Sequence, residues 1–332
     1  MHLALLGAGR IGAAHARVLA DDPRVTRLTV ADVDAARAVT VAAEVGAHPS
    51  GDPEAAIRQA DAVVIATSTT THPEMIRAAM AAGVPAFCEK PLAGDLEAAI
   101  GLAREVETAG AVLQLGFQRR FDAGYREARR MIRAGEVGTI YMARLAGHDP
   151  APPVEAYIPL SGGLFNDFTV HDFDILRWLL DDEAEEIWAI GAVRGFPMFA
   201  RYGDVDTALA TIRMRSGILV ALDATRDDPR GYDIRAEIFG SKESISVGLG
   251  PRTPIRSVEP GVPAPTEPGW PGFYPRFRDA YEEELRGFVT LVTEGGPSPC
   301  TARDAVEAMR IAAAGNLSLA EHRPVRLDEI PA

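Results

Sequence analysis

Residues 2–12 read His-Leu-Ala-Leu-Leu-Gly-Ala-Gly-Arg-Ile-Gly, a short apolar run that passes directly into a glycine-rich turn. The Ala-rich segment 13–20 follows and favours a helix. The order predicts a strand, a tight turn and a helix. In a dinucleotide-binding turn, Gly7 would allow the bend, Gly9 the approach of a pyrophosphate, and Gly12 the close packing of helix on strand. The N-terminus of that helix would then receive the anion.

An acidic residue stands where such a turn requires one. A second apolar stretch, 27–31, ends at Asp32, 20 residues after Gly12. A carboxylate at this position accepts hydrogen bonds from the adenosine ribose hydroxyls. The same charge repels the 2'-phosphate of NADP, and the next arginine, Arg37, is a turn further on, so NAD is the predicted cofactor. Asp32 could also cap a helix over 35–45, and the two roles are compatible.

Strands and helices alternate with short turns as far as residue 117. The predicted strands are 61–66, 86–88 and 112–117, and the predicted helices are 73–82 and 95–108. This alternation predicts an α/β domain with a doubly wound parallel sheet, the Rossmann fold, which binds ligands at the carboxyl ends of its strands. His72 could face the nicotinamide or cap the helix that follows it. The predicted cofactor-binding residues are Gly7, Gly9, Arg10, Ile11, Gly12, Asp32, Thr67, Ser68, His72 and Glu89.

Length and composition place the chain among two-domain globular proteins. It has 332 residues, about twice the usual length of one domain, and we divide it into residues 1–120 and 121–332. A net charge of −13 argues against nucleic acid or an anionic membrane surface as a partner. Two cysteines are too few for a disulfide framework, which fits a reducing cytoplasm. Neither a signal peptide nor a membrane span is expected.

Lysine is rare in this chain, so each lysine calls for an explanation. Among 34 basic residues only Lys90 and Lys242 are lysines, and lysine differs from arginine in that it can lose its proton near neutral pH. Lys242 falls in a predicted turn, 240–243, where a solvated lysine is ordinary. Lys90 follows the predicted strand 86–88, at the ligand-binding edge of the sheet. We therefore expect a chemical role for Lys90.

The second half reads as an α+β domain with a mostly antiparallel sheet. The predicted strands are 139–145, 187–193, 208–215, 218–225, 234–239 and 244–247, and the predicted helices are 123–133, 277–294 and 301–321. The proline-rich segment 251–275 could form a lid, an oligomer contact or a long connection.

Residues 161–174 read Ser-Gly-Gly-Leu-Phe-Asn-Asp-Phe-Thr-Val-His-Asp-Phe-Asp. Asp167 and His171 are four residues apart, so on a helix they would share one face. His171 titrates near neutral pH and suits a general base, and Asp167 could bind hydroxyls or orient the imidazole. The alternative is an ordinary surface pair. The sequence contains no metal-ligand spacing such as His-x-x-x-His or Cys-x-x-Cys, so the charge for catalysis would come from side chains.

The order of these motifs resembles that of the Gfo/Idh/MocA oxidoreductases over nearly the whole chain. The matching motifs are Gly7-x-Gly9-x-x-Gly12, Asp32, His72, Glu89-Lys90-Pro91, Gly162-Gly163 and Asp167-x-x-x-His171-Asp172. Within the family, the wording His-Asp-Pro-Ala-Pro-Pro at 148–153, with Tyr157 and 161–163, looks most like the inositol 2-dehydrogenases. His148 departs from the arginine expected there, which puts the substrate contacts at this position in doubt.

The resemblance implies NAD-dependent oxidation of a secondary hydroxyl, and it implies a homo-oligomer, a dimer or tetramer formed through the open face of the second sheet. It assigns catalysis to Lys90, Asp167 and His171, and members of the family differ in whether lysine or histidine is the acid-base group. Substrate contacts are expected from Lys90, Arg120, His148, Asp149, Asp167 and His171. The alternatives are a dehydrogenase or reductase of another sugar or polyol, an NADP-linked reductase, and a dinucleotide-sensing regulator without catalysis.

Overall fold

The computed structural model describes residues 1–332 and divides into two units. The first comprises Met1–Gln118 and Asp279–Val306, and the second comprises Arg119–Arg278 and Glu307–Ala332. From the sequence we placed a single domain boundary after residue 120. The structure places this boundary after residue 118 and assigns a later segment, Asp279–Val306, to the first unit as well.

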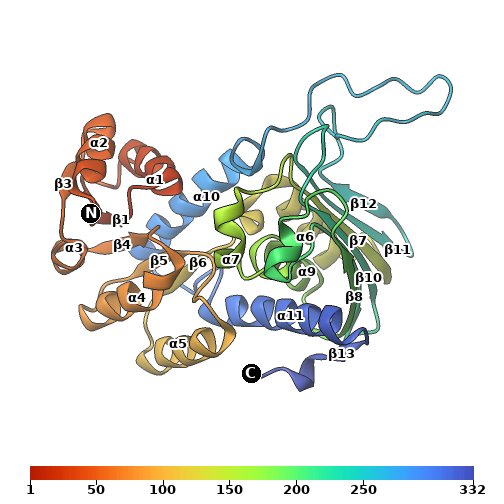
Figure 1. The fold of residues 1–332 in the computed structure, drawn as a ribbon. Helices are drawn as coiled ribbons and strands as arrows, with labels where there is room; N and C mark the ends of the chain where they lie inside the picture. The colour runs from red at the N-terminus through yellow and green to blue at the C-terminus, as the bar shows by residue number, and fades with distance from the viewer. The chain divides into compact units, whose positions relative to one another are not determined.

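The first unit is built on a six-stranded parallel sheet in the order β3-β2-β1-β4-β5-β6 (Figure 1). Its strands are β1 (His2–Leu6), β2 (Arg27–Ala31), β3 (His48–Ser50), β4 (Ala62–Ile65), β5 (Ala86–Glu89) and β6 (Leu113–Gly116). All residues of β4 are buried, as the apolar run Ala-Val-Val-Ile requires in a sheet covered on both faces. The strand order reverses between β1 and β4, which is the ligand-binding position of such sheets. The predicted fold class is confirmed.

Helices connect these strands as right-handed crossovers, so α1 and α2 cover one face of the sheet and α4 and α5 the other (Figure 1). Their bounds are α1 (Arg10–Asp21), α2 (Ala35–Val45), α3 (Pro53–Gln59), α4 (His72–Ala81) and α5 (Leu96–Ala109). Helix α10 (Phe273–Glu294) brings Leu285, Phe288 and Val289 into the same core as Leu3 and Leu5 of β1. This buried apolar face is the reason why Asp279–Val306 belongs to the first unit.

The second unit is built on a seven-stranded mixed sheet in the order β12-β11-β7-β10-β9-β8-β13. Its strands are β7 (Ile140–His148), β8 (Ala184–Ala192), β9 (Thr207–Met214), β10 (Leu219–Thr225), β11 (Asp233–Gly240), β12 (Ser244–Val247) and β13 (Val325–Arg326). Only β7 and β10 pair in parallel, and every other pair is antiparallel. The expected mostly antiparallel sheet is therefore present.

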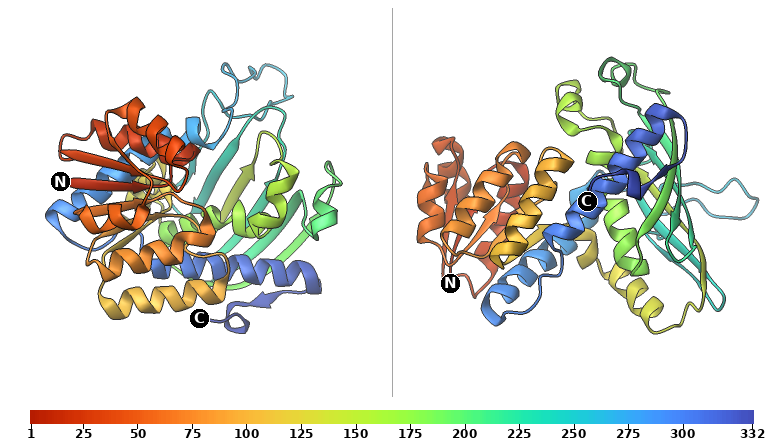
Figure 2. Two further views of the ribbon diagram at one scale, coloured as in Figure 1. Left: turned by 60° about the vertical axis from the view of Figure 1, so that its left-hand side comes forward. Right: turned by 90° about the horizontal axis from the view of Figure 1, so that it is seen from below.

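Helices cover one face of this second sheet (Figure 2). They are α6 (Ala123–Arg133), α7 (Ile158–Ser161), α8 (Leu164–Asp167), α9 (Val170–Leu180) and α11 (Ala302–Glu321). Along β9, burial alternates: Ala208 and Ala210 are buried, whereas Leu209 between them is 52% exposed. The opposite face of the sheet therefore carries exposed side chains. None of the helices is sufficiently long and apolar to span a bilayer.

Candidate functional site

The glycine turn of the first unit follows β1 and opens α1. Gly7 adopts a φ of 94°, and a Cβ there would lie 2.5 Å from the carbonyl oxygen of Ala66. A Cβ on Gly12 would lie 1.9 Å from the Gly7 carbonyl oxygen. A Cβ on Gly9, in contrast, would meet nothing within 4 Å. The protein itself requires glycine at 7 and 12, while the open space at Gly9 fits a pyrophosphate against the backbone.

Asp32 supports this turn directly. Its Oδ2 accepts a hydrogen bond from the Ala8 backbone N–H at 2.8 Å, and its Oδ1 accepts one from Asp34 N–H at 2.8 Å. The cap of α2 is Asp34, whose side chain accepts from the N–H groups of Ala36 and Arg37, so the capping role considered for Asp32 is wrong. Asp32 cannot fill it because its carboxylate is directed back to the glycine turn. The guanidinium of Arg37 lies 3.6 Å from the same carboxylate.

His72, one of the predicted cofactor-binding residues, holds the loop after β5 in place. The ring of His72 contacts the Pro91 carbonyl oxygen at 2.7 Å through Nδ1 and the Thr67 carbonyl oxygen at 3.3 Å through Nε2. It is 1% exposed, and this burial lowers its pKa, which favours the neutral ring. His72 is the first residue of α4 and not its cap. It joins the loops that follow β4 and β5.

Glu89, the last residue of β5, accepts a hydrogen bond from Nε2 of His15 at 2.7 Å. His15 is fully buried on α1, edge-on to the ring of Phe87 at 5.8 Å. Lys90 comes next, preceding a cis peptide bond to Pro91. Because β1, β4 and β5 are neighbours in the sheet, the turns that follow them line one edge of the first unit. That edge carries Gly7, Gly9, Thr67, Ser68, Glu89 and Lys90.

The stretch from Ser161 to Asp174 does not form one continuous helix. Gly162 and Gly163 have φ values of 76° and 89°, and they separate α7 from α8. Asp167 is the last residue of α8, and His171 is the second residue of α9. The single helical face expected for the pair is therefore interrupted by a two-residue joint.

Asp167 is held by two side chains. Its Oδ1 accepts a hydrogen bond from the hydroxyl of Tyr157 at 2.9 Å, and its Oδ2 lies 3.0 Å from the guanidinium of Arg226. The same guanidinium lies 3.2 Å from Asp149. The structure thus brings the predicted substrate residues Asp149 and Asp167 together around one arginine that the sequence did not single out.

His148 lies in a different cluster. A Cβ on Gly147 would face Phe168 and Asp172, and the alternation along β7 turns His148 to the opposite face of the sheet. There Nε2 of His148 lies 2.6 Å from Asp223, and Nδ1 lies 3.5 Å from Asp228 and 3.7 Å from Asp233. Burial opposes protonation, but the Asp223 hydrogen bond and the three carboxylate charges together raise the pKa of His148. Potential metal ligands thus meet at His148, Asp228 and Asp233, and the three surrounding carboxylates favour the protonated form of the imidazole.

Arg120 sits in a buried ion pair. Its Nε and Nη2 atoms donate to the two oxygens of Asp174 at 2.9 and 2.5 Å, and it is 6% exposed. The neighbouring Arg119 donates to Asp172 in a second buried pair. Its guanidinium also lies 5.8 Å from the ring centre of Phe277. Burial raises the pKa of Asp172 against the effect of Arg119. The role of Arg120 in substrate binding stays a prediction.

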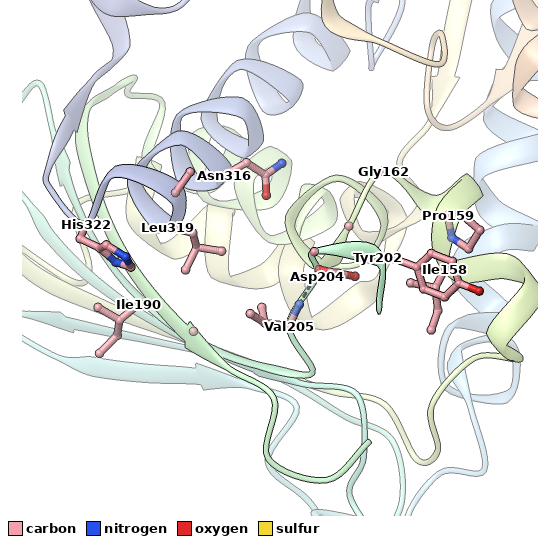
Figure 3. Close-up of a pocket in the computed structure, with 14 residues that line it drawn as sticks. Ile158, Pro159, Gly162, Ile190, Tyr202, Asp204, Val205, Asn316, Leu319 and His322 are labelled. Atoms are coloured by element: carbon pink, nitrogen blue, oxygen red, sulfur yellow. Dashed lines mark hydrogen bonds between the residues drawn. The ribbon is translucent and has the colours of Figure 1, made fainter. Parts of the chain in front are cut away.

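A cavity of about 710 Å³ lies beside the two glycines in the second unit (Figure 3). Asp204 at its wall accepts hydrogen bonds from the Leu164 and Val205 backbone N–H groups at 3.1 and 2.8 Å, and the first of these bonds satisfies the first N–H group of α8. Other lining residues come from α7, β8 and α11, from the segment 202–205 and from His322 after α11. None of the predicted catalytic residues lines this cavity.

Two family models match the chain. Residues 1–117 match an oxidoreductase family with an NAD-binding Rossmann fold, and residues 125–246 match the Gfo/Idh/MocA C-terminal domain.

Full-length relatives agree with these matches. The chain is 37% identical to a myo-inositol dehydrogenase of Streptomyces leeuwenhoekii, covering 96% of this chain and 97% of that protein. It is also 37% identical to an NAD⁺-dependent scyllo-inositol 2-dehydrogenase of Bacillus subtilis, covering 98% and 96%. A crystal structure of scyllo-inositol dehydrogenase from Lactobacillus casei with bound NAD(H) and scyllo-inositol superposes with a TM-score of 0.89 at 26% identity, covering 99% of both chains. The chain therefore belongs to the Gfo/Idh/MocA oxidoreductases and is an NAD-dependent oxidoreductase that acts on CH–OH groups.

Proposed function

We propose that the chain oxidises a secondary hydroxyl of an inositol to the ketone. The observation that carries this proposal is the similarity of the whole chain to inositol dehydrogenases at 37% identity. The paired carboxylates Asp149 and Asp167 support it, because a polyol presents several hydroxyl donors and carboxylates are acceptors of such hydrogen bonds. When NAD is bound, it accepts the hydride that leaves the reacting carbon.

The glycine turn and Asp32 would hold the cofactor in the first unit. Gly9 leaves open space at the N-terminus of α1, and α1 receives no side-chain cap, which suits a pyrophosphate bound by backbone N–H groups. His72 and Glu89 would act indirectly, since the first joins two loops and the second is hydrogen-bonded to His15.

We assign the proton transfer to His171. An imidazole titrates near neutral pH and can take the hydroxyl proton as hydride leaves. Lys90 would donate a hydrogen bond to the reacting oxygen and stabilise the developing negative charge. Asp167 would bind a neighbouring hydroxyl and set the orientation or tautomer of His171.

Initial rates of NADH formation with a panel of inositols and aldoses, run in parallel with NADP, test the proposal. We expect turnover with at least one inositol and a clear preference for NAD. Turnover of aldoses with no inositol oxidised would refute the substrate class. A preference for NADP would show that Arg37, 3.6 Å from Asp32, overrides the carboxylate.

A further inference from the structure

Arg226 is the first residue after β10, and its backbone is firmly anchored. Its N–H donates to the carbonyl oxygen of Asp206 at 2.8 Å. The Asp206 carboxylate in turn accepts hydrogen bonds at 2.8 Å from three successive backbone N–H groups, residues 194–196. These bonds outweigh the burial of the carboxyl group and lower the pKa of Asp206. Arg226 therefore starts from a rigid position at the end of its strand.

The side chain of Arg226 joins two distant parts of the chain. It is 2% exposed, and its guanidinium lies between Asp149, at the end of β7, and Asp167, at the end of α8. The ring centre of Phe168 lies 5.4 Å from the guanidinium carbon, so an aromatic face covers the cation. Burial disfavours the cation, yet the charges of Asp167 and Asp149 raise the pKa of Arg226.

The arrangement differs from the other buried arginine pairs of the second unit. Arg120 donates two hydrogen bonds to the carboxylate of Asp174, and Arg177 donates two to that of Glu183. Arg226 instead divides its guanidinium between two carboxylates. The guanidinium of arginine is planar and its N–H donors have fixed directions, so it can set the distance between two carboxylates. The ammonium of lysine is a point charge on a flexible side chain and cannot do this.

The charge of Arg226 bears on the ionisation of Asp167. Two carboxylates around one point repel each other, which would raise the pKa of one of them. A cation 3.0 Å from Asp167 and 3.2 Å from Asp149 opposes this effect and favours both anions. Tyr157 fixes the remaining oxygen of Asp167 by donating a hydrogen bond at 2.9 Å. These two contacts therefore fix both carboxylate oxygens of Asp167.

We propose that Arg226 is a positioning residue for the reaction: it keeps Asp167 ionised and fixes its orientation towards the base, and it ties Asp149 to the same charge so that both carboxylates meet the substrate at a set spacing. This inference rests on the proposed function, because it assumes that Asp167 serves the proton transfer and that both carboxylates bind a polyol.

Two substitutions separate the charge of Arg226 from its shape. In Arg226→Gln the charge is lost, and we expect kcat to fall by about 10- to 100-fold, as for other residues that orient a reacting group. We also expect the acid limb of the kcat–pH profile to move up by about one to three pH units, because the neighbouring cation that favours the carboxylate is gone. In Arg226→Lys the charge remains, so the acid limb stays near that of the parent, while the KM for the polyol rises.

Two measurements provide the controls. The KM for NAD should stay at the parent's value in both variants, which excludes a general loss of folding. Arg177→Gln removes another buried arginine pair of the second unit, and it should change stability without moving the pH profile. A purely structural role for Arg226 predicts the same behaviour for Arg226→Gln as for Arg177→Gln, with an unshifted acid limb and kcat within twofold of the parent, and that result would overturn the inference.

Further experiments apply if the variant Arg226→Gln does not fold. Should Arg226→Gln not fold, Arg226→Lys and Tyr157→Phe decide: Tyr157 is 42% exposed, and its loss should shift the acid limb in the same direction by less. A parent-like KM for the polyol in Arg226→Lys together with a parent-like acid limb in Tyr157→Phe would overturn the inference.

Should the parent oxidise no polyol, the substrate proposal fails. NMR titration of labelled histidines, with His171→Ala for assignment, then still tests the role of Arg226. A higher pKa of His171 in Arg226→Gln, with Arg226→Lys close to the parent, supports the inference, and an unchanged pKa in Arg226→Gln contradicts it.

Discussion

His148 and Asp149 are neighbours in the sequence, yet they serve different clusters. The alternation of β7 turns His148 towards Asp223, and Asp149 lies against Arg226. A substrate bound by Asp149 and Asp167, as proposed above, would lie on the face opposite to His148. At the scale of the residue, the face of the strand decides which cluster each of two adjacent polar side chains joins.

Replacing His171 tests the proton transfer. A base within hydrogen-bond reach contributes about 10²- to 10⁴-fold to the rate, so His171→Ala should lower kcat by roughly that factor. The binding of NAD, followed by fluorescence titration with NADH, should remain, because the glycine turn and Asp32 are unchanged. A kcat near that of the parent would remove His171 from the role of base and leave Lys90 as the candidate.

The cluster around His148 predicts a dependence of stability on pH. Its pKa is raised in the folded protein, so the folded state binds the proton more tightly than the unfolded state does. The resulting stabilisation is fully present below the unfolded pKa of about 6.5 and is lost as pH rises through the raised folded value. Urea unfolding of the parent and of His148→Gln should show a difference in stability at pH 6 that shrinks towards pH 9. A difference that stays constant over this range would contradict the prediction.

At the scale of the element, sequence patterns located the long regular elements well. The strand 27–31 and the helices 35–45 and 123–133 were predicted with the bounds that the structure has. The short elements β3 and α3 were not predicted. For β3 the reason is that His-Pro-Ser is too short to show a period and contains a proline. The break between α8 and α9 was not predicted either. At this break the Thr169 N–H group donates a hydrogen bond to the Leu164 carbonyl oxygen, and local helix propensity does not indicate such a bond.

The start of α1 offers a matched pair of substitutions. In Gly12→Ala the new methyl would lie 1.9 Å from the Gly7 carbonyl oxygen, so we expect a loss of stability of about 1–3 kcal/mol or more. In Gly9→Ala the methyl meets no protein atom within 4 Å, and the φ of −73° suits alanine. We expect Gly9→Ala to unfold thermally like the parent without cofactor and to bind NADH more weakly. Unchanged NADH affinity in Gly9→Ala would argue against the pyrophosphate position.

At the scale of the whole molecule, the open face of the second sheet is the predicted surface of self-association. Neighbouring strands present side chains that are about half exposed, Trp188 and Ile190 on β8, Leu209 on β9 and Leu219 on β10. Apolar side chains gathered in this way are unusual on a monomer. We expect a dimer or tetramer by light scattering after gel filtration, and Leu209→Glu should lower the measured mass. Val39→Glu on α2, equally exposed, is the control. A parent that is monomeric at micromolar concentration would refute the prediction.

Most of the hydrogen bonds and ion pairs around the predicted site could not be predicted from the sequence. The motifs pointed to Lys90, Asp149, Asp167 and His171 as single residues. Arg226 and His15 became visible only in the fold, because their partners are 59 to 77 residues away in the sequence. Ion pairs between segments this far apart leave no spacing pattern, and arginine is common in this chain.

The return of α10 into the first unit affects how the protein is made. The strands of the NAD-binding unit emerge from the ribosome first, but Leu285, Phe288 and Val289 complete their core much later. At translation rates of about 5–20 residues per second, the interval between Gln118 and Asp279 lasts roughly ten to thirty seconds. During that time the incomplete core keeps an apolar face open to solvent. We therefore expect the nascent first unit to be open to chaperone binding until the segment Asp279–Val306 has also been synthesised.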